Sequence, residues 1–286
     1  LGHLYSQKNK DYHDYSAYQS YYTNATIKKT ANSPPRKYMG LRINSLAVSV
    51  GGIIRLVVNL VAIPILVRLL GINSYGVWTT IIAQISLLAL AEMGVSTALL
   101  YRLSSYLVPK DEAAFYKCIG TALILITTFG TIFSLVYLAF LPLIAKTFHG
   151  FDTDSALLTS LKLSSLILLP KIWALFFSSI EASHQRYDMQ AIIETSTTVI
   201  LQIGIIFLAW QKASFSAMLL WLLVSSMLGV LAHILVSSKV FKINFTRIIY
   251  SKNEANGLLN FGIQHWVSSL GSSLFGQMDQ IGRAHV

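Results

Sequence analysis

The sequence contains few charged residues and a single cysteine. Asp, Glu, Lys and Arg make up 12% of the 286 residues and hydrophobic residues make up 54%, whereas about a quarter of a soluble globular domain is charged. Cys118 has no second cysteine to pair with, and the chain has no CxxC or HExxH spacing of metal ligands. These deficits exclude an intramolecular disulfide scaffold and give redox or metal chemistry no support. They indicate a membrane protein that needs no cofactor.

The formal net charge of +10 raises the alternative of a nucleic-acid-binding protein. The Lys and Arg residues, however, lie mostly in short connectors between apolar runs and form no single stripe or helix face. That distribution is typical of membrane proteins, so we expect no nucleic-acid partner.

Seven apolar runs are long enough to cross a bilayer, which takes roughly 20 residues of helix. Strands would leave backbone groups unpaired in lipid unless a whole barrel closed, and short alternating barrel strands do not occur. We therefore predict an all-α integral membrane protein with helices over residues 46–70, 75–101, 119–145, 155–180, 190–210, 213–238 and 256–278.

The basic residues of the short loops predict the orientation of the chain. If the N-terminus is cytoplasmic, the inner loops hold eight Lys or Arg residues and the outer loops hold three. The inner residues are Arg102, Lys110, Lys117, Arg186, Lys239, Lys242, Arg247 and Lys252, and the outer ones are Arg68, Lys146 and Lys212. We therefore expect a multi-pass protein with a cytoplasmic N-terminus.

The two ends of the chain differ from the rest. Residues 1–38 are rich in Tyr and polar residues, and Met39 stands just before the first run, so we interpret this stretch as disordered or as a spurious upstream extension. The last six residues, IGRAHV at 281–286, equal the translation of a common sequencing adapter in one frame. We interpret them as an artefact that truncates the gene near Gln280.

The first apolar run carries a charge near the middle of the membrane. In SVGGIIRLVVNLVAIPILVRLLG, which covers residues 49–71, Arg55 stands nine residues inside the predicted helix. Gly52, Arg55, Asn59 and Ala62 recur at helical intervals and form one small, polar stripe. A guanidinium facing lipid would leave five donors unsatisfied. We therefore expect Arg55 and Asn59 to face the bundle or a wet cavity.

Other polar residues lie within the predicted membrane spans. Lys162 and Lys171 flank Pro170, which can kink its helix, and Lys162 is the one expected to snorkel to the interface. Two structural alternatives stay open: Arg55 forms an ion pair with Glu92 or Glu194, or it lines a cavity. Gln202 lies about 80° around the helix from Glu194 and is a hydrogen-bonding neighbour. His233 is a further titratable group.

The order and spacing of several short motifs resemble those of the oligosaccharide repeat-unit flippases. These proteins form the polysaccharide transporter branch of a superfamily that includes multidrug exporters and lipid II flippases, the MATE-like MOP superfamily. The motifs are Arg68-Leu-Leu-Gly71, Tyr75-Gly76-Val-Trp78, Glu92-Met-Gly94, Thr97-Ala98, Arg102, Ala182-Ser-His-Gln185-Arg186 and Phe275-Gly-Gln-Met-Asp279. The resemblance runs from about Met39 to Gln280.

The resemblance implies a two-lobe transporter that alternates between inward-open and outward-open states. Residues 39–240 would form the N-terminal six-helix lobe, and residues 241–280 would hold a cytoplasmic connector and the start of the second lobe. The implied substrate is a polyprenyl-diphosphate-linked oligosaccharide, moved across the bacterial inner membrane during the synthesis of surface polysaccharide such as O-antigen. Membrane lipids, glycosyltransferases and a polysaccharide polymerase are the implied partners.

Together these observations give a hypothesis for the substrate cavity. Arg55, Lys171 and Lys162 would make a cationic interior for the diphosphate or an acidic sugar, because the guanidinium fork and the ammonium group bind phosphate oxygens. Asn59, Glu92, Glu194 and Gln202 would complete the cavity, and a proton or sodium gradient would drive the cycle.

Three alternatives stay open beside this reading. A lipid II flippase also carries a diphosphate-linked sugar, and an ion-coupled multidrug exporter would need a more acidic cavity. A membrane-embedded glycosyltransferase or polymerase would need a surface loop rich in catalytic residues, and the longest outer loop offers His149, Asp152 and Asp154.

Overall fold

The computed structural model describes residues 36–89, 92–107, 111–145 and 155–284. The chain divides into two units, Leu1–Leu46 and Ala47–Val286, and the described part of the first is the start of one long helix. The expected N-terminal extension lies almost wholly outside the described residues, as does the outer loop with His149, Asp152 and Asp154. The contacts below belong to the second unit.

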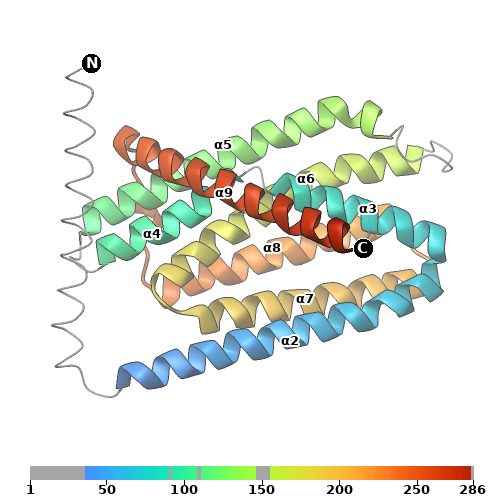
Figure 1. Cartoon of the computed structure of the whole chain (residues 1–286), viewed down its shortest axis with the longest axis horizontal. Coiled ribbons are helices and arrows are strands. Elements are labelled where there is room, and N and C mark those ends of the chain that lie inside the picture. Colours follow the sequence, from blue (N-terminus) through green and yellow to red (C-terminus); the bar gives the residue numbers. More distant parts are fainter. Residues whose placement is uncertain (1–35, 90–91, 108–110, 146–154, 285–286) are drawn as a thin grey trace. The chain divides into compact units, whose positions relative to one another are not determined.

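The described residues are almost entirely helical and contain no strand, as the sequence predicts. Figure 1 shows α2, α7 and α8 running alongside one another. The elements are α2 (Arg36–Leu70), α3 (Ile72–Ala89), α4 (Val95–Leu107), α5 (Glu112–Ala145), α6 (Ser155–Ser183), α7 (Tyr187–Trp210), α8 (Phe215–Lys239), the short 3-10 helix η2 (Phe245–Arg247) and α9 (Lys252–Ala284).

Five helices of the described part are long and apolar enough to cross a membrane, on α2, α5, α6, α7 and α8. Their outward faces carry large apolar side chains such as Leu56, Leu143 and Ile203, each about 60% exposed. Exposing such a surface to water is unfavourable in free energy, whereas the apolar tails of lipids can surround it without this penalty. The chain is therefore a multi-pass membrane protein.

Helix α6 is the centre of the bundle and packs against α3, α4, α5, α7 and α8. In its apolar window 56% of the residues are buried, against 17% in the windows of α2 and α7. Residues on α6 are therefore shielded from lipid on most sides, and polar groups there must find partners within the protein.

The second predicted helix is not continuous. It was expected over residues 75–101, but α3 ends at Ala89 and α4 begins at Val95. Between them Met93 and Gly94 have φ angles of 52° and 71°, in the left-handed region that cannot continue a helix. Hydrophobicity alone does not signal this break, because apolar residues continue on both sides of it.

Helix α9 crosses α4 at this break through two glycines. A Cβ at Gly94 would collide with the carbonyl oxygen of Gly262, and a Cβ at Gly262 would lie 2.9 Å from the carbonyl oxygen of Met93. Nearby, the rings of Tyr101 and Phe261 meet edge to face, 5.2 Å apart. Glycine at both positions lets the two backbones touch.

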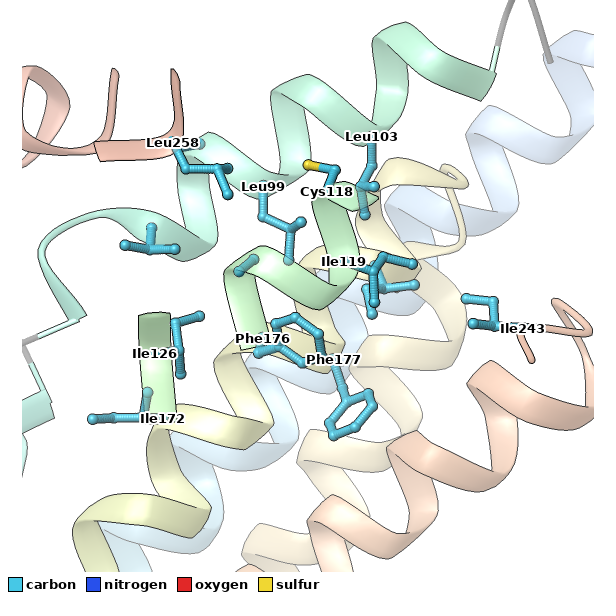
Figure 2. Packing of buried hydrophobic residues seen from close by; sticks show 14 of the residues in the cluster. Leu99, Leu103, Cys118, Ile119, Ile126, Ile172, Phe176, Phe177, Ile243 and Leu258 are labelled. Carbon is cyan, nitrogen blue, oxygen red and sulfur yellow. The ribbon is translucent and has the colours of Figure 1, made fainter. Parts of the chain in front are cut away.

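Two apolar clusters form the core at successive levels of the bundle. The first gathers the end of α2, the start of α3 and the start of α8, down to Leu222. The second gathers α4, the first half of α5 and the second half of α6, and begins on α8 at Val230. Figure 2 shows Leu99, Ile119 and Phe176 meeting in this second cluster. Along α8, Ser225, Ser226 and Gly229 fall between the two clusters, and that level holds the candidate site.

A candidate cavity lined by charged residues

The charge on α2 is paired with a carboxylate on α7. Arg55 Nη1 donates to Glu194 Oε2 at 2.8 Å, and the two side chains are 27% and 39% exposed. Gln190 Nε2 donates to the other oxygen of Glu194 at 3.0 Å. Of the two partners that the sequence left open for Arg55, the structure therefore selects Glu194.

The polar stripe of α2 continues into a second contact with α7. Gln202 Nε2 donates to Asn59 Oδ1 at 2.8 Å, and Ala62 on the same stripe is buried. The glycine that meets α7 is Gly51, where a Cβ would lie 2.8 Å from Thr195 Oγ1, whereas nothing lies within 4 Å of a Cβ at Gly52. The stripe thus contacts α7 at Arg55 and Asn59 and is buried at Ala62, although Asn59 itself is exposed. Its glycine was wrong by one residue.

A cavity of about 230 Å³ lies between α2, α6, α7 and α8. Its charged or titratable lining residues are Arg55, Lys171, Glu194 and His233. Small and polar residues complete the wall, namely Thr197, Thr198, Ser225, Ser226 and Gly229, together with Pro170, Ala174 and Leu201. The four helices thus bring together residues up to 178 positions apart in the sequence.

Lys171 differs from the other cation of this cavity, because no hydrogen bond or ion pair holds its ammonium group among the described residues. It also lines a smaller cavity of about 130 Å³ together with Trp78 and Gln202. An ammonium group between two cavities has three donors to offer an incoming acceptor. Lys171 is therefore the cation that can bind an anion without first leaving a partner.

Four of the seven residues predicted for the cavity are not among its lining residues. Asn59 and Gln202 bind each other, and Gln202 lines the smaller cavity. Lys162 is exposed on the surface of α6, in agreement with its alternative role as a snorkelled lysine. Glu92 lies at the break before α4, where its Oε2 accepts a hydrogen bond from the backbone N–H of Ser96 at 3.1 Å. A carboxylate at that position caps the N-terminus of α4. Neither residue lines the cavity of Arg55 and Lys171.

The structure contains a buried histidine–carboxylate pair, His233 and Glu181, that the sequence did not predict. His233 Nδ1 of α8 lies 2.8 Å from Glu181 Oε1 of α6, and their side chains are 3% and 0% exposed. The predicted fourth helix ended at Ile180, which placed Glu181 in a loop. Helix α6 in fact continues to Ser183, and this extra turn brings Glu181 into the bundle.

A second unpredicted cluster joins α4 to the first turn of α9. Arg102 Nε donates to Glu254 Oε2 at 2.9 Å, and the Tyr106 hydroxyl donates to Glu254 Oε1 at 2.9 Å. Burial, assisted by the carboxylate of Glu254, raises the pKa of Tyr106 to about 12. The cluster stays neutral overall in the phenol form and ties α9 to α4. The predicted seventh helix began at residue 256, so Glu254 was missed for the same reason as Glu181.

The connector between α6 and α7 carries another histidine. His184 Nδ1 donates to the carbonyl oxygen of Ile180 at 2.9 Å, and its ring stacks on Phe241 with centroids 4.3 Å apart. Burial lowers the pKa of His184, although the carbonyl opposes this shift. The imidazole is therefore held in its neutral form. In the part of the chain that the structure describes, no group of three or more His, Cys, Asp or Glu side chains could hold a metal ion.

Comparison with solved structures defines the class of fold. The chain is similar to a MOP superfamily transporter from Pyrococcus furiosus that is described as having a binding pocket of reverse polarity. The TM-score is 0.58 at 15% identity, over 82% of this chain and 53% of that chain. The fold is therefore that of a MOP transporter, and the chain spans about half the length of the transporter it matches.

Comparison with protein families then gives the family. The model of the family described as "Polysaccharide biosynthesis protein" matches residues 41–283. The chain belongs to this polysaccharide biosynthesis family, which confirms the resemblance seen in the sequence motifs. Comparison with curated proteins gives no match.

Proposed function

We propose that this chain is part of a flippase that moves polyprenyl-diphosphate-linked oligosaccharides across the bacterial inner membrane by alternating access. Its N-terminus would be cytoplasmic, and the oligosaccharide would be a repeat unit of a surface polysaccharide such as O-antigen. Glycosyltransferases and a polymerase of the same polysaccharide would supply the substrate and use the product. The family and the fold support a transporter of this kind, and the proposed flippase has no catalytic step.

The unpaired ammonium group of Lys171 is the observation that carries this proposal. A diphosphate is a dense anion, and a lysine offers it a compact charge with three donors. Arg55 already has Glu194 as its partner at 2.8 Å, so the first contact of the anion falls to Lys171. The apolar polyprenyl chain would stay in lipid, beside the exposed aliphatic face of α2.

Arg55 has a second role in this proposal, because its ion pair with Glu194 is partly exposed. The energy of such a pair is small, about 0 to 1 kcal/mol. A diphosphate can therefore compete with Glu194 for the guanidinium at little cost, and the carboxylate can take the guanidinium back when the anion leaves. Asn59 and Gln202 offer amide groups that suit the hydroxyls of a sugar.

The test is transport by the intact gene in a strain that depends on it for surface polysaccharide. Lys171→Met should reduce polysaccharide assembly at least tenfold while the amount of protein in the membrane stays the same. Lys162→Met is the matched control, because Lys162 is an exposed lysine on the same helix, and it should retain transport. Normal assembly with Lys171→Met would remove Lys171 from the mechanism.

A multidrug exporter of organic cations is the second candidate, and one observation favours it. The carboxylate of Glu194 faces the cavity, and with Lys162 outside it the excess of basic residues is smaller than the sequence suggested. Arg55 neutralises Glu194, however, and leaves Lys171 as the uncompensated charge. Export of a fluorescent cation that continues in Lys171→Met and stops in Glu194→Gln would favour this candidate.

A further inference from the structure

Glu181 and His233 form a titratable pair that the proposed substrate site does not use. The imidazole and the carboxyl group lie 2.8 Å apart between α6 and α8, and both are almost fully shielded. A carboxylate in such surroundings is costly unless it is compensated. The pair is uncharged when it holds one proton in addition to the Nδ1–H of His233, and carries a charge of −1 without that proton.

The structure leaves a place for this proton. Glu181 Oε2 is buried and has no hydrogen-bond partner among the described residues, while Oε1 faces His233. Buried polar atoms in proteins nearly always have a partner, and an exception in a titratable group indicates chemistry. A proton on Oε2 removes the charge from this oxygen, and Oε1 keeps its hydrogen bond from His233.

The face of α8 around His233 is polar as well. Ser226 and Ser237 stand seven residues before and four residues after His233, so the three share one stripe of the helix. The hydroxyl oxygens of both serines are buried and, like Glu181 Oε2, lack a partner in the described part of the chain. This stripe offers a polar path beside an otherwise apolar core.

The pair is in contact with the candidate cavity. His233 and Ser226 line it together with Lys171. A charge on the pair therefore acts on the same space in which Lys171 would hold an anion.

The other charged groups around the pair oppose one another. The carboxylates of Glu194 and Asp188 on α7 add negative charge near Glu181. Lys171 on α6 opposes it, and Arg55 on α2 is neutralised by Glu194. The remaining charged or titratable groups on the packed elements have partners or are exposed. Arg102 of α4 is bound to Glu254, and His184 in the connector after α6 donates to the carbonyl oxygen of Ile180. Lys117 of α5 and Lys239 of α8 are exposed.

We propose that Glu181 and His233 form a proton-binding site, and that a proton held there raises the affinity of the cavity for an anion at Lys171. Without the proton, the negative charge of the pair repels the anion. With the proton, this repulsion is removed and the anion binds Lys171 more tightly. Because coupling between two sites is reciprocal, binding of the anion raises the affinity of the Glu181–His233 pair for a proton. The anion-binding half of this proposal rests on the proposed function, whereas the proton site does not.

The proton site is tested first without any anion. The full chain in lipid nanodiscs is titrated with pH while the infrared band of the protonated carboxyl group of Glu181 is recorded. The band should fade as the pH rises, and it should be absent from Glu181→Gln, which keeps an acceptor for His233. If Glu181→Gln does not fold, His233→Asn provides a second assignment by moving the midpoint of the band. Absence of such a band from the wild-type protein at every pH would overturn the proposal.

The link to Lys171 is tested in the same titration. Glu181 lies ten residues from Lys171 along α6, which is about 15 Å. Removing the positive charge of Lys171 should therefore raise the pH midpoint of the Glu181 band by about half to one pH unit, at an effective dielectric constant near 20. Lys171→Met should show this shift, and Lys162→Met should not. Addition of sodium should leave the midpoint unchanged. An unshifted midpoint in Lys171→Met, or a midpoint set by sodium, would overturn the coupling.

Anion binding separates this inference from the proposed function. Sulfate serves as the probe because its charge is constant over the pH range. Wild-type protein should bind it about three to ten times more tightly below the midpoint than above it, and Glu181→Gln should bind it equally at both. Equal binding by the wild type would overturn the coupling. Absence of sulfate binding at any pH would overturn the anion role of the cavity, while the infrared titration still decides the proton site.

Discussion

Two pairs of the bundle join a carboxylate to a basic group at the same distance but in different surroundings. The Arg55–Glu194 and Glu181–His233 pairs are both 2.8 Å apart, yet the first is 27% and 39% exposed and the second 3% and 0%. The first pair lines a polar cavity of about 230 Å³, where water or an incoming anion can replace either partner at little cost. The second pair cannot be separated without a large desolvation penalty, so it changes its proton instead. Burial and the chemistry of the basic group together give the two pairs different roles, because a guanidinium is always charged whereas an imidazole can be neutral.

The largest effect should follow from breaking the buried pair. His233→Leu leaves the carboxylate of Glu181 alone in an apolar environment, which should cost about 3–5 kcal/mol. We expect little monodisperse protein in detergent and a strongly lowered thermal midpoint. The double variant Glu181→Met/His233→Leu should recover most of the loss, because it removes both polar groups. Equal instability of the single and double variants would contradict this explanation.

A smaller effect should follow from breaking the exposed pair. Arg55→Glu places two carboxylates together on α2 and α7 and should cost about 1 kcal/mol, because water screens them. Adding Glu194→Arg should restore the thermal midpoint. A loss of stability in Arg55→Glu as large as that in His233→Leu would show that the two pairs do not differ as their burial indicates.

Lys171, the unpaired cation of the cavity, differs from both pairs, because its removal should not destabilise the protein. Lys171 has a charge in the cavity and no partner there among the described residues. Lys171→Met should therefore leave the thermal midpoint unchanged or raise it, with a gain in the free energy of unfolding of up to about 1 kcal/mol. Binding residues often carry such a cost in stability. A large fall in the midpoint would indicate a structural role for Lys171.

The smallest effect concerns His184, a partly buried histidine that has no carboxylate partner among the described residues. Its pKa in the folded protein is lowered by burial, so the unfolded chain binds a proton more readily. Stability should therefore fall as the pH drops through about 6.5, the ordinary pKa of histidine, and level off below the folded value. His184→Asn should flatten this part of the pH profile of the thermal midpoint, with a change within about 0.5 kcal/mol at neutral pH. An unchanged slope would contradict the prediction.

The sequence predicted the parts of the site that depend on periodicity. The stripe of Arg55 and Asn59 could be derived because helical spacing decides which side chains share a face. The partners were predicted less well, because the sequence left Glu92 and Glu194 both open for Arg55. It also placed Gln202 beside Glu194, whereas Gln190 binds Glu194 and Gln202 binds Asn59. The all-helical membrane fold followed from hydrophobic length alone.

Positions at helix ends were predicted less well. Glu181 and Glu254 stand within one turn of a predicted boundary, where a shift of three or four residues decides between a loop and the interior of the bundle. The break before α4 was missed because it depends on the left-handed conformation of Met93 and Gly94, and an apolar run does not encode that conformation.

The contact between Gly94 and Gly262 also constrains how this family can vary. Each glycine leaves room for the backbone of the other, so a side chain at either position is tolerated only if the two helices move apart. Among homologues, the two positions should therefore be glycine together or change together. A correlated pair of this kind would mark α4 and α9 as neighbours from sequences alone, without a structure.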